Sequence, residues 1–201
     1  MATRIDNVRG LLGHTGLLFT NNARSLTLDE ACTTAGGYRS ILGVLKHMGG
    51  WVHVYWSYAF EAEPKQWDRT SWPRGMRDVV DLSPEYLAEV VAWVSDGLRK
   101  WDDALAALTD DALDELRPVH WGATAPLGQI VAMVDHEVAY HTGELNMLLS
   151  IARGKAWEYT EEVEENHIDT YGHGVRPPWM SEAQVQAYEA ARRAAHKPGA
   201  T

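Results

Sequence analysis

The sequence predicts an all-α fold: a four-helix bundle with one long crossover connection and a C-terminal arm. Apolar residues recur at helical spacing in four long stretches, and no run of strict alternation bounded by turn residues indicates a strand. The 201 residues include 45% hydrophobic and 23% charged residues, which is typical of a folded protein with a sizeable core. Nine tryptophans against two phenylalanines supply large side chains for helix interfaces and pocket walls.

The N-terminal half carries signals for two long helices and a short one. An apolar stripe predicts the first helix over residues 4–20. Thr27 and Glu30 have the spacing of a capping box, so a short helical turn is expected there. Ser40 can cap the second long helix, whose apolar face continues to about residue 61.

A long connection separates the second and third long helices. Residues 62–82 are rich in Pro, Trp, Arg and Asp and lack helical spacing, so we expect them to form a crossover. Ser83 and Pro84 combine a helix cap with proline at the first helical position, which predicts a third helix from there to about residue 108.

The last long helix is expected over residues 124–151, with Gly154 after its final turn. Residues 1–153 would then form the bundle. Residues 154–201 mix acids with aromatics before a short helix expected at residues 181–195, and we interpret them as an arm packed on the bundle. The part of this arm between residues 155 and 180 is expected to cover the bundle mouth and shape a substrate pocket with four aromatic side chains: Trp157, Tyr159, Tyr171 and Trp179.

Charge and cysteine content narrow the function classes. The 18 Lys and Arg residues against 28 Asp and Glu give a net charge of −10, the wrong sign for coating a phosphate backbone, so no nucleic-acid partner is expected. Cys32 is the single cysteine, which excludes an intrachain disulfide. No apolar run approaches the roughly 18 residues that span a bilayer, and the first residues lack the apolar segment of a signal peptide. We therefore expect a cytoplasmic protein without a membrane partner.

The densest group of titratable residues lies inside the fourth long helix. At about 100° per residue, Glu137 and His141 lie about 40° apart, and Glu144 falls roughly 20° to the other side of Glu137. The face that they share also carries apolar residues, so the group is predicted to point into the bundle. Buried ionised groups need a partner.

A metal ion is the partner that this pattern suggests. A carboxylate and an imidazole four residues apart on a helix can both reach one cation, and His47 on the second long helix is the natural third donor. Catalytic zinc commonly has three protein ligands, so His47, Glu137 and His141 predict a catalytic site. Glu144 and His136 are then the candidates for proton transfer or for holding a ligand.

Two other interpretations stay open from spacing alone. Glu137 and His141 also fit an ion pair on a solvated helix face. His47 also fits a core histidine whose ring is bonded to a backbone carbonyl.

Two passages of the chain resemble the DinB family of four-helix bundles, also called the YfiT-like metalloenzymes. Residues 40–48, SILGVLKHM, are similar to the second-helix segment that supplies one histidine ligand. Residues 136–145, HEVAYHTGEL, are similar to the fourth-helix pattern of two ligands four residues apart. The resemblance spans about residues 4–152. Glu137 stands where many members carry histidine, and it resembles the actinobacterial branch that contains mycothiol-dependent maleylpyruvate isomerase.

The resemblance implies a divalent metal at His47, Glu137 and His141, zinc first and nickel as the alternative. It further implies that this metal binds a low-molecular-weight thiol, mycothiol in that branch, and presents it as a nucleophilic thiolate. The function predicted is a metal-dependent thiol S-transferase, with a small-molecule thiol and an electrophilic substrate as partners and a homodimer as the assembly considered. A hydrolase that activates water and a non-catalytic metal-binding stress protein are the alternatives.

Overall fold

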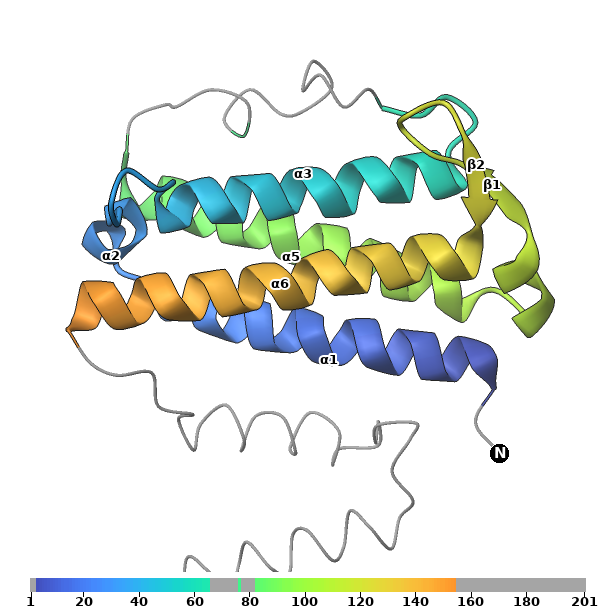
Figure 1. Cartoon of the computed structure of the whole chain (residues 1–201), viewed down its shortest axis with the longest axis horizontal. Helices are drawn as coiled ribbons and strands as arrows, with labels where there is room; N and C mark the ends of the chain where they lie inside the picture. Colours follow the sequence, from blue (N-terminus) through green and yellow to red (C-terminus); the bar gives the residue numbers. More distant parts are fainter. Residues whose placement is uncertain (1–2, 66–75, 77–81, 155–201) are drawn as a thin grey trace, which may run out of the picture.

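Four long helices lie alongside one another in the computed structural model of the chain, which describes residues 3–65, Met76 and residues 82–154 (Figure 1). The predicted all-α architecture is confirmed. The four helices, in chain order, are α1 (Arg4–Arg24), α3 (Ile41–Phe60), α5 (Pro84–Ala106) and α6 (Leu127–Arg153).

The packing of the helices gives the bundle two opposite seams. Helix α1 packs on α5 and α6, and α3 also packs on α5 and α6, so α1 lies diagonally across from α3. The seam between α3 and α6 is therefore on the other side of the bundle from the seam between α1 and α5. Large apolar side chains from all four helices fill the space between them, including the fully buried Phe19, Leu45, Trp101 and Leu148.

The caps expected from the sequence form at three helix starts. The short helix α2 (Leu28–Cys32) opens with a capping box, in which the Thr27 hydroxyl and the Glu30 carboxylate each accept the other residue's backbone N–H. The side chains of Ser40 and Ser83 cap α3 and α5. At the end of α6, Gly154 adopts a left-handed conformation with φ of 62°, which a glycine reaches without steric cost.

A two-stranded hairpin corrects the expected start of the last helix. Strand β1 (Leu116–Pro118) pairs antiparallel with β2 (Thr124–Pro126), after a short 3₁₀ helix, η1 (Asp110–Asp114). Residues 124–126 are therefore extended, and α6 begins at Leu127 instead of residue 124. Strands of three residues are too short to show an alternating pattern, so nothing in the sequence separated them from the helix that follows.

Helix α1 also continues further than expected. It ends at Arg24 instead of residue 20, and Asn21 and Asn22, which follow the expected end, are helical. The reason is tertiary: the side-chain amide of Asn22 donates a hydrogen bond of 2.7 Å to the side-chain oxygen of Asn146 on α6. Asparagine often marks the end of a helix, but Asn22 instead lies inside α1 and connects it to α6.

Several expectations fall outside the described residues. These are most of the crossover (residues 66–75 and 77–81), the whole C-terminal arm from residue 155, and the short helix expected at residues 181–195. Met76, within the crossover, is described and buried. Among the helices of the described part, none is both long enough and apolar enough to cross a membrane.

Helices α3 and α5 come close enough that two glycines are required between them. A Cβ atom added at Gly97 of α5 would lie 2.5 Å from a methyl group of Val52 and 3.0 Å from the ring of His53. A Cβ atom at Gly49 of α3 would lie 2.3 Å from the ring of Trp93. The absence of side chains at these positions therefore sets the position of α3, which carries His47.

Substitution of Gly97 tests this close approach. We expect Gly97→Ala to lower the free energy of unfolding by about 1–3 kcal/mol, the usual cost of an overpacked core. The matched control is Gly143→Ala on α6, where an added Cβ meets nothing within 4 Å. There the better helix propensity of alanine is expected to raise stability by about 0.5–1 kcal/mol. Urea unfolding measures both; equal effects of the two substitutions would contradict the packing argument.

Candidate metal centre

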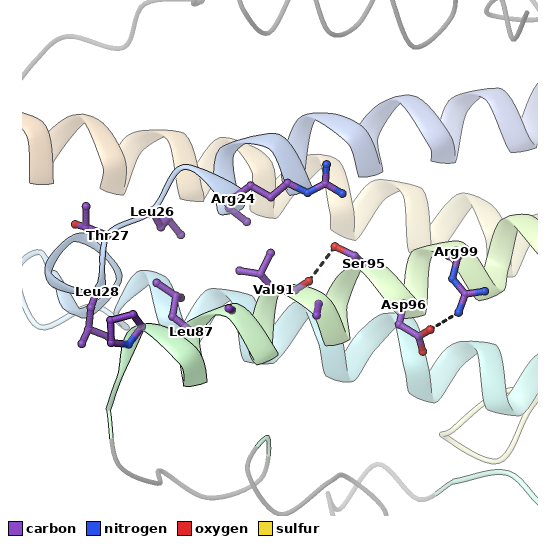
Figure 2. Close-up of a pocket in the computed structure, with 13 residues that line it drawn as sticks. Arg24, Leu26, Thr27, Leu28, Leu87, Val91, Ser95, Asp96 and Arg99 are labelled. Atoms are coloured by element: carbon purple, nitrogen blue, oxygen red, sulfur yellow. Dashed lines mark hydrogen bonds and ion pairs between the residues drawn. The ribbon is translucent and has the colours of Figure 1, made fainter. Parts of the chain in front are cut away.

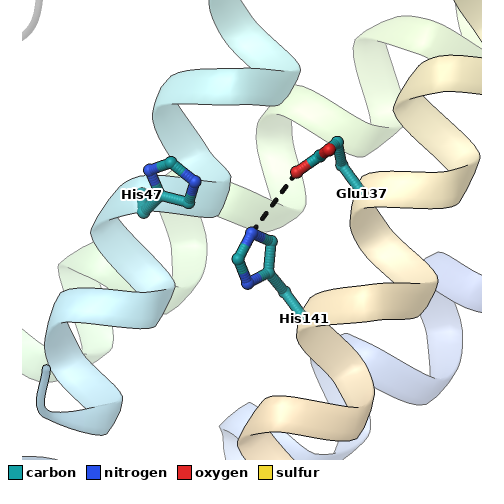
Figure 3. Close-up of side chains that lie close together, drawn as sticks. All are labelled: His47, Glu137 and His141. Carbon is teal, nitrogen blue, oxygen red and sulfur yellow. Dashed lines mark ion pairs between the residues drawn. The ribbon is translucent and has the colours of Figure 1, made fainter. Parts of the chain in front are cut away.

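Three side chains that could bind a metal meet across the seam between α3 and α6. His47 projects from α3, and Glu137 and His141 project from neighbouring turns of α6 (Figure 3). One ligand atom from each residue lies within 4.8 Å of the other two. The rings of His47 and His141 approach edge to face, with centroids 4.9 Å apart. The three residues that the sequence grouped are thus brought together.

His141 lies at the centre of the cluster and uses both of its ring nitrogens. Its side chain is only 3% exposed. Its Nε2 atom lies 3.4 Å from a carboxylate oxygen of Glu137, and its Nδ1 atom is hydrogen-bonded to the carboxylate of Glu144. When Nδ1–H donates to Glu144, the lone pair of Nε2 points toward Glu137. A histidine held in this way by a carboxylate is the usual arrangement at protein metal sites.

The charges around the cluster fit a divalent cation. Glu144 is 5% exposed and Glu137 is 24% exposed at their side chains, so two carboxylates are withdrawn from water beside the imidazole of His141. One positive charge partly offsets them, because Arg39 Nε lies 3.5 Å from Glu144 Oε1. Removing a carboxylate from water costs several kcal/mol unless a counter-charge repays it. Two imidazoles and a carboxylate are also donors that divalent zinc and nickel accept.

Two residues of the loop before α3 contact this centre and were not anticipated from the sequence. Arg39 reaches Glu144 from one side. Tyr38 lies close to the same carboxylate, and the proximity of Glu144 raises the pKa of the Tyr38 hydroxyl. Their spacing to Glu144 in the sequence carries no signal, because the contact forms only when the loop folds back on α6.

An aromatic wall, made of Trp51, Tyr55, His120 and Trp121, extends from the cluster along α3 to the hairpin turn. The rings of Trp51 and Tyr55 stack with centroids 4.4 Å apart, and Trp51 also contacts His47 at 6.3 Å. The ring of His120 lies 5.2 Å from that of Tyr55 and 4.9 Å from that of Trp121, which is 53% exposed. The wall joins the metal cluster to the surface.

Burial sets the protonation of the titratable members of this wall. Desolvation lowers the pKa of His120, which favours its neutral form. Desolvation, together with the charge of Glu137, raises the pKa of Tyr55. Residues 47, 51 and 55 follow one another at four-residue spacing, a sequence signal that could have identified this side of the wall. His120 had no such signal, because the hairpin delivers it.

The two residues expected to act beside the metal ligands lie in different surroundings. Glu144 is buried against His141, as described. His136 is exposed on α6 and does not join the group of ligand atoms found among the described residues. His53, on α3, is bonded through Nε2 to the carbonyl oxygen of Trp93 at 2.8 Å and so belongs to the core.

Metal content tests the cluster directly. We expect purified protein to hold about one divalent metal per chain, and His141→Ala to lose it, since that change removes the donor at the centre. His136→Ala is the matched control, a neighbouring exposed histidine whose loss should leave the metal content unchanged. Elemental analysis after dialysis measures both. Equal metal content in wild type and His141→Ala would show that the site is elsewhere.

The contact between Glu144 and His141 gives a second test. Glu144→Gln keeps the size of the side chain but removes the charge that holds Nδ1–H, so the metal affinity should fall by about 10–100-fold. Competition with a chelator of known affinity measures this. An unchanged affinity would mean that Glu144 does not orient the ligand.

Comparison with known proteins agrees with this geometry. The family model of the DinB superfamily matches residues 18–145, more than half of the chain. No curated protein and no solved structure matches the chain. The matched range includes His47, Glu137 and His141. Because the match covers more than half of the chain, including α3 and the part of α6 that carries Glu137 and His141, the chain belongs to the DinB superfamily, a metal-binding family.

Proposed function

We propose that this protein is a metal-dependent thiol S-transferase. It holds a divalent metal, zinc or alternatively nickel, at His47, Glu137 and His141, and uses it to activate a low-molecular-weight thiol. The main support is the number of donors: among the described residues, three side chains converge at the cluster, and catalytic zinc commonly has three protein ligands where structural zinc has four. Three donors leave room for a small ligand.

The chemistry assigned to the metal is limited to one effect. When bound, a divalent cation favours the deprotonated form of a thiol, which is the nucleophilic form. The thiolate sulfur then forms a bond to the electrophilic carbon of the second substrate, and the leaving group departs with the bonding electrons. The thiol proton passes to solvent.

The side chains of the chain orient and shield this reaction. Glu144 is the positioning residue, because it holds the ring of His141 through Nδ1. Arg39 in turn lies against Glu144 and offsets its charge. Trp51 and Tyr55 present aromatic surface beside His47, which keeps water from one side of the site and offers a contact for an apolar substrate. His136, exposed next to Glu137, remains a candidate for proton transfer at the rim.

Mycothiol is the thiol that we propose first. Its support is the resemblance of Glu137, in place of the commoner histidine, to the mycothiol-dependent branch of the family.

Proton release on thiol binding tests the proposal. A free thiol with a pKa of about 8.5 is mostly protonated at neutral pH, so its binding as a thiolate should release close to one proton. Calorimetry in two buffers of different ionisation enthalpy measures that proton for mycothiol, glutathione and cysteine. We expect the signal to disappear in Glu137→Ala and to persist in Glu89→Ala, a control acid exposed on α5.

The alternatives give different results in the same experiment. If metal-loaded protein binds none of these thiols but hydrolyses an ester or amide, the hydrolase replaces the transferase. If it neither binds thiols nor hydrolyses such substrates, the metal serves the stability of the bundle only.

A further inference from the structure

An arginine beside the metal cluster has hydrogen-bond donors that the described part of the chain does not use. Arg39 contacts Glu144 through its Nε atom, 3.5 Å from Oε1, and its side chain is 40% exposed. Among the described residues, no acceptor takes a hydrogen bond from either of its two Nη atoms. A guanidinium binds a carboxylate best through two parallel N–H donors. The Nη atoms of Arg39 are therefore available to an anionic ligand.

The turn before α3 holds Arg39 in this place. The backbone N–H of Tyr38 donates to the carbonyl oxygen of Ala35 at 2.9 Å. The two residues between them, Gly36 and Gly37, have φ of 55° and 80°, which a tight turn with this hydrogen bond requires. The guanidinium of Arg39 also lies over the ring of Tyr38, 5.7 Å from its centroid. The arginine is therefore positioned before a ligand binds.

The metal cluster lies between a cationic end and an aromatic end of the seam between α3 and α6. At one end, Arg39 contacts Glu144. At the other end, the charge of Glu137 acts on Tyr55, a member of the aromatic wall. His141 lies between the two glutamates. A ligand bound at the cluster therefore meets a positive charge in one direction and aromatic rings in the other.

The surroundings of the cluster otherwise disfavour an anionic ligand. The carboxylates of Glu137 and Glu144 lie beside His141, and the whole chain has a formal net charge of −10. Like charges repel one another, and burial strengthens this repulsion because it removes the screening by water. The guanidinium of Arg39 has the opposite charge and a planar shape that matches a carboxylate. Arg39 is thus the residue that would allow an anionic substrate to bind here.

We propose that Arg39 binds a carboxylate of the substrate and makes the site selective for anionic substrates. The reactive group of the substrate faces the metal cluster, and its carboxylate accepts hydrogen bonds from the Nη atoms. One carboxylate and one imidazole ring separate Nε of Arg39 from Nε2 of His141, so the two groups of the substrate lie up to about 10 Å apart. The inference rests on the proposed function, in which either the thiol or the electrophile can carry this carboxylate.

A matched pair of hydroxamates tests the carboxylate site without a thiol. Octanohydroxamate and suberic acid monohydroxamate share a metal-binding group and a chain length, but the second ends in a carboxylate where the first ends in a methyl group. Calorimetry with metal-loaded protein measures both affinities. We expect wild type to prefer the carboxylate probe, and this preference to fall about 3–10-fold in Arg39→Gln. Arg39→Lys keeps the charge but not the planar guanidinium, so it should retain part of the preference.

Arg24→Gln is the matched control for the loss of one positive charge. Arg24 is exposed at the end of α1, where it lines a cavity of about 1110 Å³ between α1, α2 and α5 (Figure 2). Because α1 lies diagonally across the bundle from α3, we expect this variant to keep the preference of wild type. Metal content verifies that the cluster is intact in every variant.

Three results would overturn the proposal. The preference could fall equally in Arg24→Gln and Arg39→Gln, which would indicate an effect of overall charge. Arg39→Gln could weaken both probes by the same factor, which would mean that Arg39 acts only through Glu144. Binding of neither probe would show that no ligand reaches the cluster in this way.

Thiols identify which substrate carries the carboxylate. Glutathione has two carboxylates, and its diethyl ester has none. A preference for glutathione over the ester that disappears in Arg39→Gln assigns the carboxylate to the thiol. Equal affinity for both thiols, with the hydroxamate preference retained, assigns it to the electrophile. If metal-loaded protein binds neither these thiols nor mycothiol but keeps the hydroxamate preference, the carboxylate site stands and the transferase proposal fails.

Discussion

The site depends on one buried histidine held between two carboxylates. His141 is bonded to Glu144 through Nδ1 and faces Glu137 through Nε2, all within about two turns of one helix. An α-helix fixes the spacing of such residues rigidly, so α6 alone determines two donors and the carboxylate that orients one of them. The burial that makes this arrangement costly for free carboxylates also makes it selective for a cation. The remaining architecture brings a third donor to this pair.

That third donor reaches the cluster because α3 is held at a definite distance and rotation. Gly49 leaves room for the ring of Trp93 and Gly97 for the side chains of Val52 and His53, so α3 and α5 pack closely. The indole N–H of Trp101 also donates to the carbonyl oxygen of Val52 at 2.9 Å. These contacts lie on the side of α3 away from α6. Tight packing at one face of α3 therefore directs His47 on its other face toward Glu137 and His141.

Two segments outside the long helices complete the metal centre, and they supply a positive charge and further aromatic side chains. The loop before α3 brings Tyr38 and Arg39 against Glu144, and the hairpin turn brings His120 and Trp121 against Tyr55. The loop before α3 changes the charge beside His141, because it places Arg39 against Glu144. The hairpin turn extends the aromatic surface outward from the metal cluster. Functional residues often lie on such segments, since a rigid scaffold leaves loops to vary.

The sequence by itself determined the helices, their caps and the shared face of Glu137, His141 and Glu144, because helical periodicity and capping are local properties of the chain. It also indicated His47 as a partner by residue type. Only the tertiary structure decided that His136 is exposed while Glu144 is buried, that Asn22 remains helical to reach Asn146, and that residues 124–126 form a strand. Those outcomes depend on contacts between residues far apart in the chain, which no local pattern encodes.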